Sequence, residues 1–311
     1  MQSSPELAAL LVIGDSREHA QLALDSLYAQ TIVGSMEIIV VDLKTNDAPQ
    51  LSVSSRAPTR YVTPEREMTW GEGRALAAKL AVAPVLAFIE GHCIAERGWA
   101  EALVRAHRQP FVAVGYAFTN PHPETYLSRA TLTSKYGSWL HPTTSRVTRV
   151  LPAGNVAYKR DELLKFGDDL VNLLTPDSVM HERFNEQGLS MYVESGAIVA
   201  HNSLVKLSQL LESSFVFCRI LAAKRMEAQR WSRTRRLGYG LATPIVSPCI
   251  ATWRLFSTQS ETPAEWKYLP VVLAKGAACA LGESVGYLFG AGSSEMDFVK
   301  WELHVARVRA A

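Results

Sequence analysis

Short apolar runs alternate with helical patterns along the first half of the chain, and this alternation constrains the fold more than any other feature. Four runs have the composition of strands buried on both faces: Leu7–Ile13, Glu37–Asp42, Val85–Glu90 and Phe111–Val114. The segments Arg17–Gln30 and Gly73–Ala83, which lie between these runs, are predicted to be helices. Strands joined through helices pair in parallel, because a parallel connection needs a crossover of a dozen or more residues. The sequence therefore predicts an α/β domain of the nucleotide-binding kind, with a mostly parallel sheet flanked by helices.

Composition and charge exclude several classes of protein. The chain has 311 residues, 48% of them hydrophobic, so it can bury a core and is not intrinsically disordered. Its 32 Lys and Arg residues oppose 30 Asp and Glu residues, which argues against general nucleic-acid binding. The four cysteines show no CxxC spacing, and no basic segment precedes the first apolar run. These features favour a reducing compartment and predict no signal peptide, so we expect a cytoplasmic protein.

Two of the predicted strands end in an acidic residue. Asp42 ends the second run and Glu90 ends the third. Ligands of such sheets bind beyond the carboxyl ends of the strands, so both carboxylates are expected in a ligand crevice. A helix cap or a loop position explains either acid alone, but two in one domain favour a site.

A second α/β stretch follows a segment rich in turn-forming residues. Residues 119–149 contain the sequences NPHPE and HPTTS and are predicted to form a loop. In this stretch Leu151–Arg160 carries the pair Gly154-Asn155. The elements expected after it are helices over Asp161–Phe166 and Thr175–Gly188, and strands at Met191–Val193 and Ala197–Ala200. The first domain is therefore expected to span residues 1–205.

Six sequence elements, in this order, resemble those of family-2 glycosyltransferases with the GT-A fold. They are LLVIGDSREHAQLALDSLYAQT, EIIVVD, WGEGRALAAKLA, FIEGHCIAERGW, AGNVAYKRDEL and DSVMHERFNEQGLSMYVESGAIVAH. No single element is specific, but their order is. The resemblance implies a GT-A domain, which is Rossmann-like, and an inverting enzyme that moves a sugar from a nucleotide-diphosphate sugar, UDP- or GDP-linked, to an acceptor hydroxyl.

The resemblance also implies a divalent metal. Departure of a diphosphate develops negative charge, which a divalent cation neutralises. Glu90-Gly91-His92 stands where the family has an Asp-x-Asp metal motif, and His201 aligns with a strand-terminal histidine near the same metal. Glutamate with histidine suits Mn²⁺ better than Mg²⁺. A loop that has lost its metal is the alternative for this changed motif.

Further roles follow from the same resemblance. Asp42 would bind the base or ribose, and Arg74 lies where the family has an arginine near the donor, although a solvated helix residue is equally compatible with its position. Gly154 and Asn155 would form a tight turn at the floor of the acceptor site. Asp177 aligns with the general base, which must take the acceptor proton, while a proline replaces the acid that precedes it in the family. Glu182 and Asp169 are the alternative bases.

Residues 206–311 differ in character from the first domain. Lys206–Met226 is predicted to be one amphipathic helix, and residues 219–236 carry seven basic residues and one acid. Two apolar segments follow, at 237–256 and 268–290. Prolines break the first segment, while Lys275 and Glu283 interrupt the second, so neither is a clean transmembrane span.

A basic cluster followed by apolar segments is what an anionic membrane surface attracts. We expect a C-terminal helical extension that is peripheral on the inner face of the cell membrane; a solvated helix face in an ordinary subdomain is the alternative. The sequence GESVGYLFG resembles the tails of bacterial surface-polysaccharide glycosyltransferases, which implies an acceptor glycan or lipid-linked sugar.

Two other functions are alternatives to the enzyme. A non-catalytic GT-A-like binding or scaffold subunit fits the changed metal motif. A nucleotidyltransferase needs a basic Gly-rich loop after the first strand, which GDSRE is not. The sequence also lacks a P-loop, a nucleophile elbow and a complete dinucleotide fingerprint.

Overall fold

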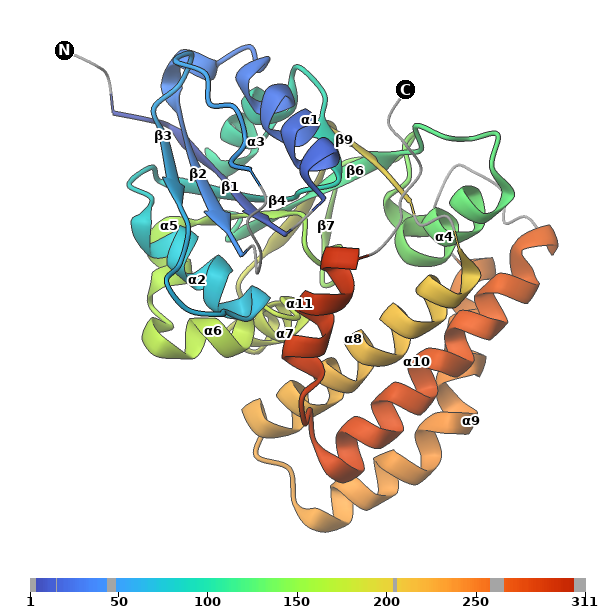
Figure 1. Ribbon diagram of the computed structural model, residues 1–311. Coiled ribbons are helices and arrows are strands. Elements are labelled where there is room, and N and C mark those ends of the chain that lie inside the picture. Colours follow the sequence, from blue (N-terminus) through green and yellow to red (C-terminus); the bar gives the residue numbers. More distant parts are fainter. Residues whose placement is uncertain (1–3, 15, 44–48, 204–205, 258–265, 305–311) are drawn as a thin grey trace. The chain divides into compact units, whose positions relative to one another are not determined.

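The computed structural model describes residues 4–14, 16–43, 49–203, 206–257 and 266–304 (Figure 1). The chain forms two compact units. The first consists of Met1–Thr119 and His141–His201, and the second of Asn120–Leu140 and Asn202–Ala311. The sequence predicts a division at residue 205, whereas the structure also assigns residues 120–140 to the second unit.

The first unit is built on a nine-stranded mixed sheet of order β3-β2-β1-β4-β8-β6-β9-β5, with β7 paired to β9. Its strands are β1 (Leu7–Ile13), β2 (Met36–Asp42), β3 (Thr59–Val62), β4 (Val85–Glu90), β5 (Cys93–Ala95), β6 (Ala113–Thr119), β7 (Arg146–Thr148), β8 (Val156–Lys159) and β9 (Met191–His201). The longer pairings, among β1 to β4 and between β6 and β9, are parallel. The short pairings of β5, β7 and β8 are antiparallel. The predicted α/β fold with a mostly parallel sheet is confirmed.

Helices connect and cover these strands. They are α1 (Arg17–Tyr28), α2 (Trp70–Leu80), α3 (Trp99–His107), α5 (Arg160–Leu164), α6 (Leu170–Leu173) and α7 (Ser178–Glu186), with 3-10 turns at Val33–Ser35 and Gly167–Asp169. Every residue of β1 and β2 is buried, as expected for strands covered on both faces. A capping box between Thr69 and Glu72 fixes the start of α2.

The register of the sheet places two acidic residues on either side of β1. Ile13 pairs with Asp42 on β2, and Val12 pairs with Glu90 on β4. Two strand spacings of about 4.8 Å separate β2 from β4, so the acids end strands about 10 Å apart at the same carboxyl edge. The expected position of both residues at this edge is confirmed.

The prediction of a loop over residues 119–149 is wrong. The segment contains α4 (Tyr126–Tyr136), a 3-10 turn (Gly137–Trp139) and β7. Thr and Ser have modest helix propensity, and α4 is stabilised instead by packing, since Ala130 lies in an apolar cluster with Tyr268 and Val271. Two boundaries also differ: β6 begins at Ala113 rather than at residue 111, and the two strands expected after residue 190 are the single strand β9.

The second unit is helical. Besides α4 it contains α8 (Leu207–Ala228), α9 (Arg233–Ser257), a 3-10 turn (Trp266–Tyr268), α10 (Leu269–Phe289) and α11 (Ser294–His304). Helices α8, α9 and α10 pack side by side (Figure 1). A Cβ at Gly282 of α10 would lie 2.1 Å from the Phe215 carbonyl oxygen of α8, so the glycines of GESVGYLFG allow these two helices to approach closely.

One stretch among the described residues, Trp266–Phe289, is long and apolar enough to cross a membrane by length and composition alone. Of its most apolar window, 39% is buried within the protein.

Candidate functional site

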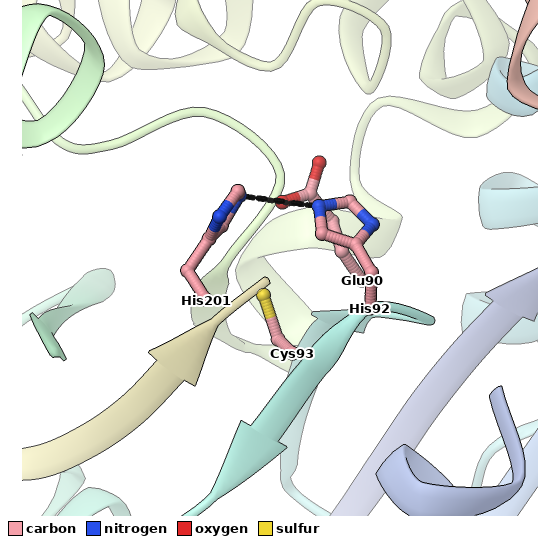
Figure 2. A group of neighbouring side chains, drawn as sticks. All are labelled: Glu90, His92, Cys93 and His201. Atoms are coloured by element: carbon pink, nitrogen blue, oxygen red, sulfur yellow. Dashed lines mark hydrogen bonds and ion pairs between the residues drawn. The ribbon is translucent and has the colours of Figure 1, made fainter. Parts of the chain in front are cut away.

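Three predicted metal ligands come together at the carboxyl edge of the sheet. Glu90 ends β4, His92 lies in the turn before β5, and His201 ends β9. The antiparallel pairing of β5 with β9 brings them together, because it sets the residue after His92 opposite His201. The two Nε2 atoms are 3.1 Å apart, and Glu90 Oε2 lies 3.6 Å from His92 Nε2 and 3.7 Å from His201 Nε2 (Figure 2).

The spacing of these atoms fits a metal ion. An imidazole nitrogen binds a transition metal at about 2.1 Å, so two ligands of one ion lie roughly 3.0–3.4 Å apart. Small shifts in the Glu90 side chain, which is 23% exposed, would bring its oxygen within that range. Both histidines are buried and present their Nε2 atoms to the same point. Two imidazoles and one carboxylate form a donor set that suits Mn²⁺, Fe²⁺ or Zn²⁺ better than Mg²⁺.

Cys93 is a fourth potential ligand that the sequence did not indicate. One ligand atom from each of Glu90, His92, Cys93 and His201 can be chosen so that all four lie within 4.8 Å of one another. Figure 2 shows the Cys93 sulfur below the imidazoles and the carboxylate. The only available sequence signal was its position next to the metal motif.

Asn155 orients Glu90. The Asn155 side chain is fully buried, and its Nδ2 donates to Glu90 Oε2 at 2.6 Å while its Oδ1 accepts from the Glu90 backbone N–H at 3.0 Å. The two contacts hold Glu90 at its backbone and at its carboxylate. The resemblance places Asn155 at the floor of the acceptor site; the structure shows it hydrogen-bonded to Glu90, one of the predicted metal ligands.

Gly154 lies against the same carboxylate. Its φ of +89° is in the left-handed region, and a Cβ there would be 2.8 Å from Glu90 Oε1. Its N–H donates to Asp177 Oδ2 at 3.0 Å, and its carbonyl accepts from Arg74 at 3.1 Å. Glycine is therefore required both by the backbone and by the space, as expected for a tight turn.

Asp177 is the centre of a buried network. It is the N-cap residue of α7, not a first-turn residue as the sequence predicts, and it is 2% exposed. Besides Gly154, the Tyr158 hydroxyl donates to it at 3.3 Å, and Arg74 lies 3.9 Å away. The Tyr158 hydroxyl also contacts His181 Nε2 at 2.9 Å. Asp177 thus holds the turn that carries Gly154 beside Glu90.

Burial sets the protonation states around Asp177. It raises the pKa of Tyr158 well above its usual value, and it lowers the pKa of His181. A neutral phenol and a neutral imidazole therefore face the carboxylate, and Arg74 supplies the positive charge. Arg74 also donates to the Leu174 carbonyl at 3.0 Å, so it is not a solvated helix residue. Of the alternative bases, Glu182 is half-buried and Asp169 is exposed.

Asp42 lies in a separate, closed environment. Its carboxylate is fully buried, with Arg17 donating to both oxygens at 2.9 and 3.0 Å. The Tyr61 hydroxyl donates to Oδ2 at 2.5 Å. Burial, followed by this hydrogen bond, raises the pKa of Tyr61 to about 12.

Neither Arg17 nor Tyr61 was predicted from the sequence. A cation in the first turn of a helix opposes the helix dipole, so the position of Arg17 was the available signal for a tertiary partner.

Comparison with solved structures identifies the fold. The mannosyltransferase PcManGT from Pyrobaculum calidifontis, in complex with GDP-Man and Mn²⁺, matches with a TM-score of 0.58 at 14% identity, over 92% of this chain and 88% of that chain. S. aureus TarS matches with a TM-score of 0.46 at 14% identity, over 91% of this chain and 55% of that chain. No protein-family model matches the sequence, and no curated protein matches it significantly. The similarity to PcManGT confirms the predicted fold class, a GT-A α/β fold with C-terminal helices.

Proposed function

We propose that the protein is an inverting, metal-dependent glycosyltransferase of the family-2 kind, which uses a UDP- or GDP-linked sugar. The observation that carries the proposal is the triad of Glu90, His92 and His201, whose potential ligand atoms lie 3.1, 3.6 and 3.7 Å from one another at the carboxyl edge of the sheet. The fold supports it, since PcManGT was solved with GDP-Man and Mn²⁺.

In this proposal the triad holds Mn²⁺ or Mg²⁺, with the donor set favouring Mn²⁺. When bound, the ion neutralises the charge that develops on the leaving diphosphate. Asn155 keeps the Glu90 carboxylate turned toward the imidazoles, while Arg74 and Asp177 hold the turn at Gly154 in place. The acceptor is proposed to be a surface glycan or a lipid-linked sugar.

Asp177 is proposed as the general base. Both of its carboxylate oxygens accept hydrogen bonds within the protein, from the Gly154 N–H and the Tyr158 hydroxyl. To take a proton from the acceptor hydroxyl, one of these oxygens must bind that hydroxyl in addition to its present partner. The Asp177→Asn variant tests this role. Loss of turnover with unchanged donor and metal binding supports a base, whereas loss of metal binding assigns Asp177 to positioning alone.

Asp42 is proposed to contact the base or ribose of the donor. Because Arg17 and Tyr61 already occupy its carboxylate, a nucleoside reaches Asp42 only by sharing or displacing one of these contacts. A nucleoside with hydrogen-bond acceptors can also be bound by the Arg17 guanidinium, which is partly exposed.

A non-catalytic binding subunit is the second candidate function. The burial of Asp177 favours it, because a general base must come within hydrogen-bond reach of its proton. Hydrolysis of a nucleotide sugar separates the two functions: a metal-dependent rate that is abolished in both His92→Ala and Asp177→Asn supports the enzyme. Donor binding without any turnover supports the binding subunit.

A thermal-shift screen tests donor class and metal use together. We expect GDP or UDP to raise the unfolding midpoint only in the presence of Mn²⁺, and His92→Ala to abolish this shift. His141→Ala is the matched control, because His141 is an exposed histidine of the same unit and should leave the shift unchanged. Equal shifts with and without metal would contradict the metal site, and no shift with any nucleotide would contradict donor binding.

A further inference from the structure

Helices α9 and α10 leave large apolar side chains on the surface of the second unit. On α9 the exposed residues include Leu241 and Ile245, which are 71% and 74% exposed and lie one helical turn apart. We define the α9–α10 apolar surface by its exposed members: Leu237, Leu241, Ile245, Val246, Ile250 and Trp253 of α9, and Leu273, Leu281 and Phe289 of α10. Exposed apolar residues gathered on two packed helices mark an interaction surface.

Several polar groups along α9 and α10 are hydrogen-bonded within the unit. Lys275 Nζ donates to the Ser134 carbonyl of α4 at 2.8 Å, and Glu283 accepts from the Ser247 hydroxyl of α9 at 2.8 Å. The Ser284 hydroxyl donates to the Gly240 carbonyl at 2.6 Å. The two charges that interrupt the apolar sequence of α10 are thus hydrogen-bonded inside the unit and do not place charge on the apolar surface.

A basic end adjoins this surface. The Arg236 guanidinium donates to the Tyr287 carbonyl at 3.1 Å, which places the start of α9 beside the end of α10. Arg230, Arg233 and Arg235 are exposed there, and we call these three residues the basic end. Arg235 lies 4.0 Å from the centre of the Trp231 ring, an aromatic of the kind enriched at membrane–water interfaces.

Fewer basic side chains of residues 219–236 are exposed than the sequence alone suggests. Lys224 is buried and forms an ion pair with Glu295 at 2.7 Å. The side chains of Arg219 and Arg225 are only partly exposed, and they donate to the Gly290 carbonyl and the Tyr287 hydroxyl. The exposed charge of residues 219–236 therefore comes mainly from the basic end, not from all seven cations.

We propose that the α9–α10 apolar surface and the basic end dock together on an anionic lipid bilayer. The apolar side chains enter the interfacial region, and the three arginines contact the headgroups. Charge complementarity selects lipid over a second copy of the chain, because α9 carries no acidic residue to face the arginines. The cytoplasmic leaflet is the anionic one, which places the protein on the inner face of the membrane. This docking is independent of the proposed activity.

Vesicle flotation of the full chain tests the proposal. We expect binding to phosphatidylcholine vesicles that contain phosphatidylglycerol, weaker binding in high salt, and little binding to phosphatidylcholine alone. The triple variant Arg230→Gln, Arg233→Gln, Arg235→Gln should bind about 100-fold more weakly. The double variant Leu241→Glu, Ile245→Glu should lose binding, while Val53→Glu, an exposed apolar residue of the first unit, should not.

A second measurement leaves the docking surface unsubstituted except for a label. Cys249 is exposed on α9, so an environment-sensitive fluorophore can be attached to it in a Cys279→Ser background. Addition of the anionic vesicles should shift its emission to shorter wavelengths. Absence of both flotation and shift overturns the proposal. It is also overturned if the protein instead forms a concentration-dependent dimer that the double variant dissolves, because the surface would then be a contact between copies.

Discussion

Asp42 and Glu90 end β2 and β4, the two strands that flank β1 and run parallel to it. Both residues lie at the same edge of the sheet, yet their carboxylates have different surroundings. The carboxylate of Asp42 is fully buried, with a bidentate ion pair to Arg17 and a hydrogen bond from Tyr61. Glu90 is partly exposed and faces two imidazoles. The charge of Asp42 is thus paired with a guanidinium in the protein interior, whereas that of Glu90 lies beside two histidines at the edge of the sheet.

This difference explains what each position can do. Disrupting a buried ion pair such as that of Asp42 and Arg17 is costly because it leaves a charge uncompensated, so a ligand of Asp42 must share its contacts and not break them. A carboxylate beside two imidazoles is instead a set of electron-pair donors of the kind that holds a divalent transition-metal ion. The same sequence signal, an acid at the end of an apolar strand, therefore leads to a closed pair in one case and to a candidate metal site in the other.

Removing the charge of Asp42 should have the largest effect on stability. The Asp42→Asn variant leaves Arg17, whose side chain is 15% exposed, without its counter-ion, and we expect a loss of about 3–5 kcal/mol in the free energy of unfolding. Denaturant titration measures it. Asp25→Asn is the matched control, because Asp25 is exposed on α1, and should change stability by less than about 0.5 kcal/mol. A loss as small as the control's would mean that the Asp42 carboxylate is available to a ligand.

His107, the last residue of α3, shows a third way to bury an ionisable group. Burial, followed by the nearby charge of Lys159, lowers its pKa to about 4 from the usual 6.5, so it is neutral rather than paired. Because the folded pKa is the lower one, its contribution is fully present above pH 6.5 and is lost as the pH falls from there toward 4. We expect a loss of about 3 kcal/mol over that window.

The His107→Leu variant isolates this contribution. Its free energy of unfolding should fall by about 3 kcal/mol less than that of the wild type between neutral pH and pH of about 4, as measured by denaturant titration at each pH. Parallel pH profiles for the two proteins would show that the buried imidazole becomes protonated without a cost in stability.

How far the sequence predicts the molecule depends on whether a signal is local. Strands β1, β2 and β4 were predictable because full burial demands an unbroken apolar run. Helix α4 was not, because its Thr- and Ser-containing sequence becomes helical through packing against residues about 140 positions away, such as Tyr268. The local sequence pattern of α4 does not indicate this long-range contact.

The residues of the candidate site also differ in whether a local sequence signal indicates them. Glu90 and His92 belong to one short motif, but His201 is 109 residues from His92 and only the β5–β9 pairing brings them together. The resemblance to a known family suggested this grouping; spacing alone could not. The partners of Asp42 were not predicted: Arg17 lies in the first sequence element but the resemblance assigns it no role, and Tyr61 lies outside all six elements.

Neutralising Glu90 should affect metal binding more than folding. The Glu90→Gln variant keeps the size of the side chain but removes its charge, and we expect Mn²⁺ affinity to fall at least 100-fold, since loss of an outer partner alone typically costs 10–100-fold. Titration calorimetry measures this. Glu96→Gln, an exposed glutamate in the same segment, should bind Mn²⁺ like the wild type. Equal affinities in all three proteins would contradict Glu90 as a ligand and remove the contrast with Asp42.

Substitution of Asn155 tests whether metal binding depends on the orientation of the Glu90 carboxylate as well as on its charge. Asn155→Ala removes both hydrogen bonds to Glu90 but leaves its charge, so we expect Mn²⁺ affinity to fall by about 10–100-fold, less than in Glu90→Gln. Asn185→Ala, which removes an exposed side-chain contact to the Arg149 carbonyl, should have no effect on the metal. An unfolding midpoint measured without metal separates loss of orientation from loss of fold. If Asn155→Ala binds Mn²⁺ normally, Glu90 is oriented by the imidazoles themselves, and the predicted contact of Asn155 with the acceptor becomes the better account of its position.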